Sequence, residues 1–313
     1  MDVLQHKLAL PVPLLIALTC LPFSASAGPV LGAGLSSFTV LGATTVTNVP
    51  TSAITGNVGD WSSGGANAVT GFLSSPGVAV SDPQVTGGLV YAGNTAVAQT
   101  AQQDLSAAIL NLASLGPGTT LSSDLTGLTL APGVYTVAAG TTNLAGTLTL
   151  DGGGNANAAW VFQMPSTLVT SSNSIVKTID TGSGAGVFWD VGSSATIGSG
   201  STFLGNLLAL TSITMNTGAT DLCGRALAST GAVTLAQNQV SSGNCTGVVS
   251  GSSGLSGGLT VTKTPSGKTV TTFLPRVAAP EINAASAASA LMLLFGGLAV
   301  LFDRRRFRLA TRQ

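Results

Sequence analysis

The feature that most constrains the fold is a repeat of about nineteen residues in the second half of the chain. Three consecutive blocks begin with Gly186, Gly205 and Gly224 and together span residues 186–242, with a one-residue slip after the first block. Each block holds two short strand-like runs separated by small residues. This pattern is typical of a solenoid, because one coil cannot bury its apolar side alone whereas stacked coils share a continuous core. The repeat therefore predicts a mainly β fold built from stacked coils.

Alternation along each short run predicts which side chains face solvent, since successive side chains of a strand point to opposite faces. In the middle block, Ile213 and Met215 should face the core, whereas Thr214 should face outward. The outward residues of the three blocks read Ala-x-Thr once and Ser-x-Thr twice, and two Thr-x-Thr segments earlier in the chain show the same alternation. The predicted outward set is Ser194, Thr196, Ser212, Thr214, Ala232 and Thr234, with Thr45, Thr47, Thr147 and Thr149 added from the earlier segments.

Residues 94–115 are rich in Ala, Gln and Leu and break the β pattern. Their apolar residues recur at helical spacing, and the Gly-Pro-Gly sequence at 116–118 ends the pattern. The segment predicts one long amphipathic helix packed along the solenoid. Its expected buried face consists of Val97, Ala101, Leu105, Ala108, Ile109 and Leu112.

The two ends of the chain have the character of targeting segments. Residues 1–27 combine Lys7, an apolar run and an Ala-Ser-Ala cleavage site before Gly28, which predicts a helical secretory signal peptide. Near the other end, residues 284–302 are mostly apolar and are followed by an arginine cluster. At 1.5 Å per residue this stretch is about 29 Å long, enough for a transmembrane helix with a cytoplasmic C-terminus.

The C-terminal tail, residues 280–313, begins with Pro280-Glu281 and resembles the PEP-CTERM sorting signals of Gram-negative bacteria. The resemblance implies recognition at Pro280 and Glu281 by an exosortase-type membrane protease, with transient residence of residues 284–302 in the inner membrane. The product would be extracellular or held at the outer cell surface. Ile282 stands where the motif usually has a second proline, so a plain single-pass anchor stays open. Residues 250–279, rich in Gly, Ser and Thr, are interpreted as a linker between this tail and a domain at 28–249.

The amino-acid composition excludes several classes of function. Only 7% of the residues are charged and the formal net charge is zero, which argues against a nucleic-acid partner. The one histidine, His6, lies in the predicted signal peptide, and Asp180 and Asp190 are the nearest approach to a catalytic carboxylate pair. We therefore expect that the protein is not an enzyme and that it binds neither a metal ion nor a cofactor. The two cysteines of the predicted mature domain, Cys223 and Cys245, are expected to form a disulfide in an exported protein, with free thiols as the alternative.

Longer segments carry a family resemblance. These are FTVLGATTVTNVPTSAITGNVG at 38–59, LAPGVYTVAAGTTNLAGTLTLDG at 130–152, WVFQMPSTLVT at 160–170 and FLGNLLALTSITMNTGATDLCGRALASTGAVTL at 203–235. In their order along the chain and in their amino-acid sequence, these segments resemble the DUF3494 ice-binding proteins of bacteria, fungi and algae, over about residues 30–246. The resemblance implies a discontinuous right-handed parallel β-solenoid of triangular section with one helix alongside. It also implies that one flat face binds ice in active members.

The physical properties of threonine fit such a face. Neighbouring coils of a parallel sheet lie about 4.7–4.9 Å apart, and alternate side chains on a strand about 6.6 Å apart, which is close in scale to the repeats of ice. Threonine has a stiff χ1 angle, an apolar methyl and a hydroxyl that can position water. We therefore predict that the outward set contacts ice and that the protein acts as an antifreeze or inhibits ice recrystallisation. The alternative is a non-enzymatic surface or extracellular-matrix protein without ice affinity.

Overall fold

The computed structural model of the chain describes residues 30–62, 69–73, 79–93, 95–182 and 184–242, together with the backbone of 259–263 and 269–273. The predicted signal peptide, Cys245 and the predicted sorting tail lie outside these residues. Within the described part, no helix is both long enough and apolar enough to cross a membrane.

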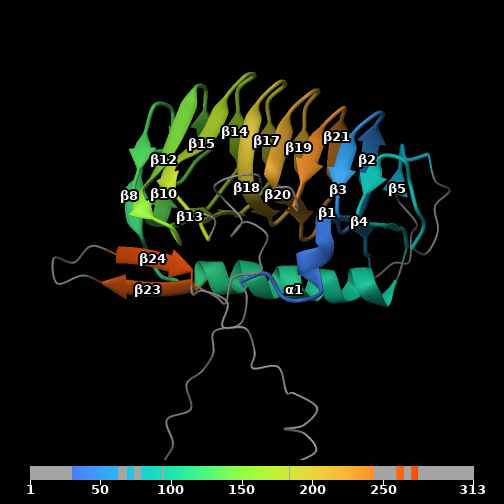
Figure 1. The fold of residues 1–313 in the computed structure, drawn as a ribbon, viewed down its shortest axis with the longest axis horizontal. Helices are drawn as coiled ribbons and strands as arrows, with labels where there is room; N and C mark the ends of the chain where they lie inside the picture. The colour runs from blue at the N-terminus through green and yellow to red at the C-terminus, as the bar shows by residue number, and fades with distance from the viewer. Residues whose placement is uncertain are drawn as a thin grey trace, which may run out of the picture.

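Two large sheets of parallel strands wind into a solenoid with three faces, and one long helix lies along one of them (Figure 1). The "helix-covered face" and the "third face" together make up a 15-stranded sheet, and the "threonine face" is a separate 7-stranded sheet. Each coil from residue 186 to 241 contributes one strand segment to each face. The predicted mainly β fold of parallel coils is confirmed.

Each face is a stack of parallel strands, one from each successive coil. The threonine face contains, in order along the stack, β11 (Thr142–Leu144), β14 (Leu168–Thr170), β17 (Ala195–Ile197), β19 (Ile213–Met215), β21 (Val233–Ala236), β2 (Val46–Val49) and β5 (Val69–Thr70). The helix-covered face contains β8 (Thr119–Leu121), β10 (Gly133–Val137), β13 (Ala159–Met164), β16 (Gly186–Val191), β18 (Thr202–Ala209), β20 (Thr220–Ala228), β1 (Phe38–Gly42), β4 (Asn57–Asp60) and β7 (Val90–Tyr91). The third face contains β9 (Thr129–Leu130), β12 (Thr147–Asn155), β15 (Ile175–Thr181), the first residues of β18 and β20, β22 (Gln239–Ser241), β3 (Ala53–Thr55) and β6 (Val85–Thr86).

The order of coils in space differs from their order in the chain. The first coil, β1–β3, lies between the last coil, β20–β22, and the second coil, β4–β6. After the second coil, the chain passes through the helix to the far end of the stack and builds the remaining coils back toward the first (Figure 1). The solenoid is therefore discontinuous in chain order, and the stack of coils is complete only when the N-terminal coil pairs with the last coil of the domain.

The repeat predicted from glycine is present but uneven. Gly205 pairs with Gly224, nineteen residues on, whereas β16 and β18 align at an offset of eighteen and β19 and β21 at an offset of twenty. The register shifts between Phe203 and Gly205, where the chain turns from the third face to the helix-covered face. Gly205 has φ +115, and a Cβ there would lie 2.7 Å from Cβ of Val187, so this corner requires glycine.

The interior is filled by the inward side chains of all three faces. Ile213, Val233 and Leu235 are fully buried, as alternation predicts. A file of aromatic rings runs through the core, and its closest pair, Phe162 and Trp189, stacks with ring centroids 4.2 Å apart. The indole N–H of Trp189 donates to the carbonyl oxygen of Leu204 at 2.9 Å. These aromatic side chains therefore serve the core and form no exposed platform for a ligand.

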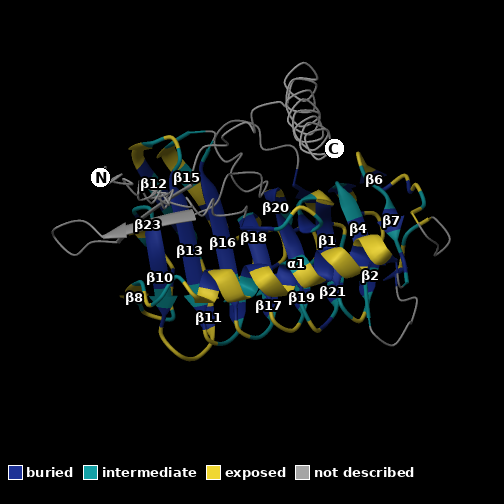
Figure 2. Ribbon diagram, turned by 90° about the horizontal axis from the view of Figure 1, so that it is seen from below, coloured by how far each residue is buried: buried dark blue, intermediate teal, exposed yellow. Residues whose placement is uncertain are grey.

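The helix α1 (Ala96–Ala113) lies within the predicted range and covers one face of the solenoid (Figure 2). Its first turn is capped by the Thr95 hydroxyl, which accepts from the Ala98 N–H at 3.1 Å. The prediction for Val97 is wrong, because Val97 is 46% exposed and Ala98 takes the inward position. The buried side consists of Ala98, Ala101, Gln102, Leu105, Ala108 and Leu112.

A single helical turn of type 3-10, η1 (Leu35–Ser37), precedes β1. It is held against α1 by the Asp104 carboxylate, which accepts from the Gly34 N–H at 2.7 Å. The helix therefore fixes the start of the first coil as well as covering the sheet.

A buried charged network joins the first coil to the last ones. The Arg225 guanidinium, 1% exposed, donates to the carbonyl oxygens of Phe38 and Ser36 and to Oδ1 of Asn206, at 2.8–2.9 Å. Burial lowers the pKa of Arg225 to about 10, against the attraction of Asp221, which raises it. Burial also raises the pKa of Asp221 to about 8, although the N–H groups of Gly205 and Cys223 and the charge of Arg225 lower it. Arg225 thus links the N-terminal coil to the later coils through buried hydrogen bonds.

Beyond the solenoid, β23 (Leu259–Lys263) and β24 (Thr269–Phe273) pair antiparallel. They lie within the range interpreted as a linker. The loss of the coil repeat there is consistent with this separate pairing, and the Thr and Val content of both segments favours strands.

Candidate functional site

The threonine face carries a row of threonines on five adjacent strands. Register pairs Thr196 with Thr214, Thr214 with Thr234, Thr234 with Thr47, and Thr47 with Thr70. We call these five residues the threonine row. Each lies between inward residues or at a strand end and is half-buried or exposed, so its hydroxyl and methyl reach the surface. The sequence predicted four of the five members.

Thr70 is the member that the sequence missed. It lies on β5, a strand of only two residues, and its Oγ1 is 3.4 Å from Oγ1 of Thr47. Two residues are too few for alternation to be recognised, so only pairing with β2 reveals the position. At the other end, the row continues into Val169 on β14 and Asn143 on β11, which keeps the spacing but ends the threonine run.

A second row flanks the first at the entry to each strand. It consists of Ser194, Ser212, Ala232 and Thr45, all half-buried and each two residues before a member of the threonine row. Oγ of Ser194 accepts from the Ser212 N–H at 3.3 Å, and Oγ of Ser212 accepts from the Ala232 N–H at 3.1 Å. The hydroxyls of Ser194 and Ser212 therefore hydrogen-bond to the backbone of the next coil as well as facing outward. Their main contribution is to hold neighbouring coils in position beside the threonine row.

Thr147 and Thr149 do not belong to this site, so the prediction that they share the face with the others is wrong. Both lie on β12 of the third face, where Thr147 pairs with Ile175 and Thr149 pairs with Thr129 and Lys177. Thr-x-Thr recurs there because any strand with one buried side shows the same alternation. The pattern identifies an outward position but does not identify the face.

The two faces that α1 does not cover differ in charge and regularity. No charged side chain points outward from the described strands of the threonine face, and their pairings show no register shift. The third face presents Lys177 next to the apolar Ile175 and Ile179, and its pairing of β12 with β15 is interrupted after Asp151. Only the threonine face is therefore both uncharged and regular.

Asp180 and Asp190, the nearest approach to a catalytic carboxylate pair, both lie away from the threonine face. Asp190 lies on β16 of the helix-covered face, where burial raises its pKa to about 6. Asp180 lies on β15 of the third face with a positive φ of 46°. The two carboxylates thus belong to different faces, which does not favour their joint use in catalysis.

Asp190 gives a testable pH dependence. Because its pKa is higher in the folded protein than the ordinary 3.8, the folded state binds this proton more tightly, and stability falls as the pH rises from about 4 through 6. Asp190→Asn should therefore raise the free energy of unfolding at pH 8 by about 1–2 kcal/mol, discounted for the partial exposure of the group, and change it little at pH 3.5. Urea unfolding of both proteins at the two pH values measures this. An equal effect at both pH values would contradict it.

The structural features define a class of protein: a parallel β-solenoid, discontinuous in chain order, with a covering helix and one uncharged, regular face bearing a row of threonines. The ice-binding-like family matches residues 40–241, and the chain belongs to this family. The resemblance of the sequence to the DUF3494 ice-binding proteins is thereby confirmed.

Individual relatives agree with this assignment. An ice-binding protein of Nostoc sp. (strain HG1) is 48% identical over 207 residues, covering 66% of this chain and 71% of that protein. Among solved structures, an ice-binding protein of the Antarctic ascomycete Antarctomyces psychrotrophicus superposes with a TM-score of 0.58 at 36% identity, covering 68% of this chain and 97% of that one. An ice-binding protein from Arctic yeast gives a TM-score of 0.60 at 29% identity, covering 67% and 92%.

Proposed function

We propose that the protein is not an enzyme and that it adsorbs to ice through the threonine face, limiting ice growth or recrystallisation. The observation that carries the proposal is the threonine row: five threonines in register on adjacent strands of an uncharged sheet without bulges. The relatives named as ice-binding proteins support it.

The physical basis is the addition of many weak contacts. Parallel strands place neighbouring threonines about 4.7–4.9 Å apart, and the stiff χ1 angle of threonine means that little rotamer entropy is lost on docking. Each hydroxyl can hold one ordered water, and each methyl displaces another. Because the backbone of stacked coils is rigid, these contacts act together on a flat, ordered surface.

Partition into ice tests the proposal. Fluorescently labelled protein should be taken up into a slowly growing ice hemisphere, and the purified protein should show thermal hysteresis. Exclusion from the ice, with no hysteresis, would favour the alternative of a surface or matrix protein on the same scaffold.

We further propose that the protein is exported through residues 1–27 and sorted at Pro280-Glu281, so that it acts outside the cell or on the outer surface. The apolar run at 284–302 and the arginines after it support this. Mass spectrometry of the protein from its natural host gives both ends of the mature chain, and retention of either segment would contradict the corresponding step.

We also propose the disulfide between Cys223 and Cys245. Cys223 is 6% exposed on β20, close to the end of the solenoid domain. A bridge closing this loop of about twenty residues would stabilise the folded state by roughly 3 kcal/mol. Reductant should therefore lower the melting temperature of the wild-type protein and leave that of Cys245→Ser unchanged. Equal melting curves of the wild-type protein with and without reductant would contradict the bridge.

A further inference from the structure

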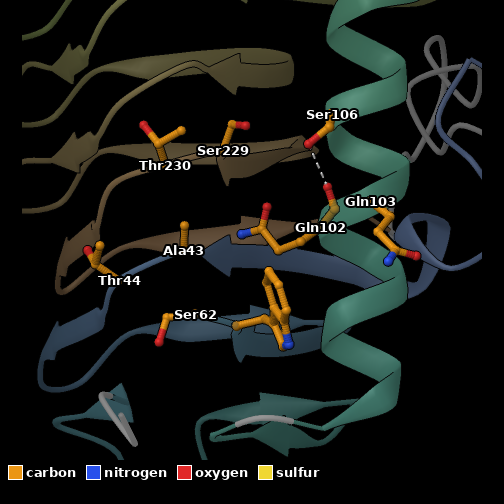
Figure 3. A pocket seen from close by; sticks show the side chains of 9 residues that line it. Ala43, Thr44, Ser62, Gln102, Gln103, Ser106, Ser229 and Thr230 are labelled. Atoms are coloured by element: carbon orange, nitrogen blue, oxygen red, sulfur yellow. Dashed lines mark hydrogen bonds between the residues drawn. The ribbon is translucent and has the colours of Figure 1, made fainter. Parts of the chain in front are cut away.

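A pocket of about 320 Å³ lies where α1 passes over the corners of the first and last coils (Figure 3). Its wall on one side is α1, with Gln102 and Ser106, and on the other the corners that precede β2 and β21, with Thr44, Ser229 and Thr230. The pocket is at the edge of the threonine face and not on it. Of the described residues that line it, none is charged.

Gln102 leaves one polar atom at the pocket without a partner. Its Nε2 donates to the carbonyl oxygens of Gly42 at 2.8 Å and Ala228 at 3.1 Å, which fixes the orientation of the amide. The side chain is 4% exposed, reaches from α1 toward Ala43 (Figure 3), and its Oε1 has no hydrogen-bond donor. A buried acceptor without a donor is costly, so a molecule that brings a donor into the pocket would favour a small shift of this amide that lets Oε1 reach it.

Two hydroxyls at the pocket are acceptors as well. The Ser106 hydroxyl donates to the carbonyl oxygen of Gln102 at 3.0 Å, and the Thr230 hydroxyl donates to that of Leu210 at 2.6 Å. Since each proton is committed, the free lone pairs can only accept. The pocket thus offers two hydroxyl acceptors, those of Ser106 and Thr230, beside the buried Oε1 of Gln102 and the half-buried indole of Trp61.

We propose that this pocket binds one pyranose ring of a neutral polysaccharide. A sugar supplies several hydroxyl donors for Gln102, Ser106 and Thr230 and an apolar C–H face that can pack on the indole of Trp61. A cationic ligand is not favoured, because no described lining residue is a carboxylate. The ligand would hold the domain to extracellular or cell-surface polysaccharide, a role independent of ice adsorption.

Saturation-transfer NMR with methyl glucopyranoside tests the site directly. We expect saturable binding to the purified protein with a Kd of roughly 1–10 mM, and no comparable signal from choline. Ser106→Phe, which introduces a ring from the exposed side of α1, should weaken binding at least about tenfold. Ser114→Phe, at the C-terminal end of the same helix, is the matched control and should bind like the wild type.

Trp61→Leu provides a second variant, and its signal should also be lost because the indole carries the ring contact; undiminished binding to this variant would overturn the proposal. No signal from the pyranoside at saturating concentration would overturn the proposal, as would undiminished binding to Ser106→Phe. Preferential binding of choline would overturn it too, since a neutral ligand is required. Circular dichroism melting confirms that each variant compared is folded.

Discussion

Ice adsorption is expected to be lost when Thr214 and Thr234 are both replaced by tyrosine. These threonines pair in register at the middle of the threonine row, so two bulky rings there would lift the sheet away from a flat ice surface across the neighbouring rungs. Because both side chains point away from the core, the fold should be retained. Thermal hysteresis should fall to the level of a protein without ice affinity, while the circular dichroism melting temperature changes little.

The third face supplies a matched control. Thr202 and Thr220 also pair in register on adjacent strands and face outward, so Thr202→Tyr plus Thr220→Tyr introduces the same two rings in the same relation. This variant should keep wild-type hysteresis. Loss of activity in the control and not in the Thr214 and Thr234 variant would move the site to the third face, where Thr147 and Thr149 lie.

Arg225→Leu is expected to destabilise the fold more than any surface substitution. It leaves the buried carbonyl oxygens of Phe38 and Ser36 and Oδ1 of Asn206 without their donors, and it removes the charge that lowers the pKa of Asp221. Removing one partner of a buried charged network costs about 3–5 kcal/mol, which corresponds to a fall in melting temperature of about 10 °C or more for a domain of this size. Urea and thermal unfolding measure the loss. Lys177→Leu, which removes an exposed cation of the third face, is the control and should change stability by less than about 0.5 kcal/mol.

The same substitution links stability to the site. Arg225 holds the coil that carries Thr47, and Thr47 joins Thr234 to Thr70. Weaker docking of this coil should therefore interrupt the threonine row, so the thermal hysteresis of Arg225→Leu, measured at the freezing point of the solution where the solenoid is still folded, should be lower than that of the wild-type protein. A folded Arg225→Leu variant that is less stable than the wild-type protein but keeps its full thermal hysteresis would contradict this link.

Local pattern was sufficient for much of the fold. The glycine-spaced repeat predicted stacked coils, alternation predicted that Ile213 and Met215 are buried while Thr214 is not, and helical spacing predicted α1 to within two residues at each end. These features depend on side chains a few residues apart. Composition likewise excluded a charged binding surface, because so few ionisable residues are present to form one.

The location of the site depended on contacts between distant parts of the chain. Whether a Thr-x-Thr strand belongs to the threonine face or to the third face is decided by its pairing partners, which is why Thr47 joined the row and Thr147 and Thr149 did not. The place of Thr70 in the row, and the position of the first coil between the last and the second, likewise depend on strand pairing. The sequence by itself determined that threonines would point outward from a β-solenoid, because alternation is a local property of strands. Only the tertiary structure decided which of them share a surface, because strand pairing joins residues almost two hundred positions apart.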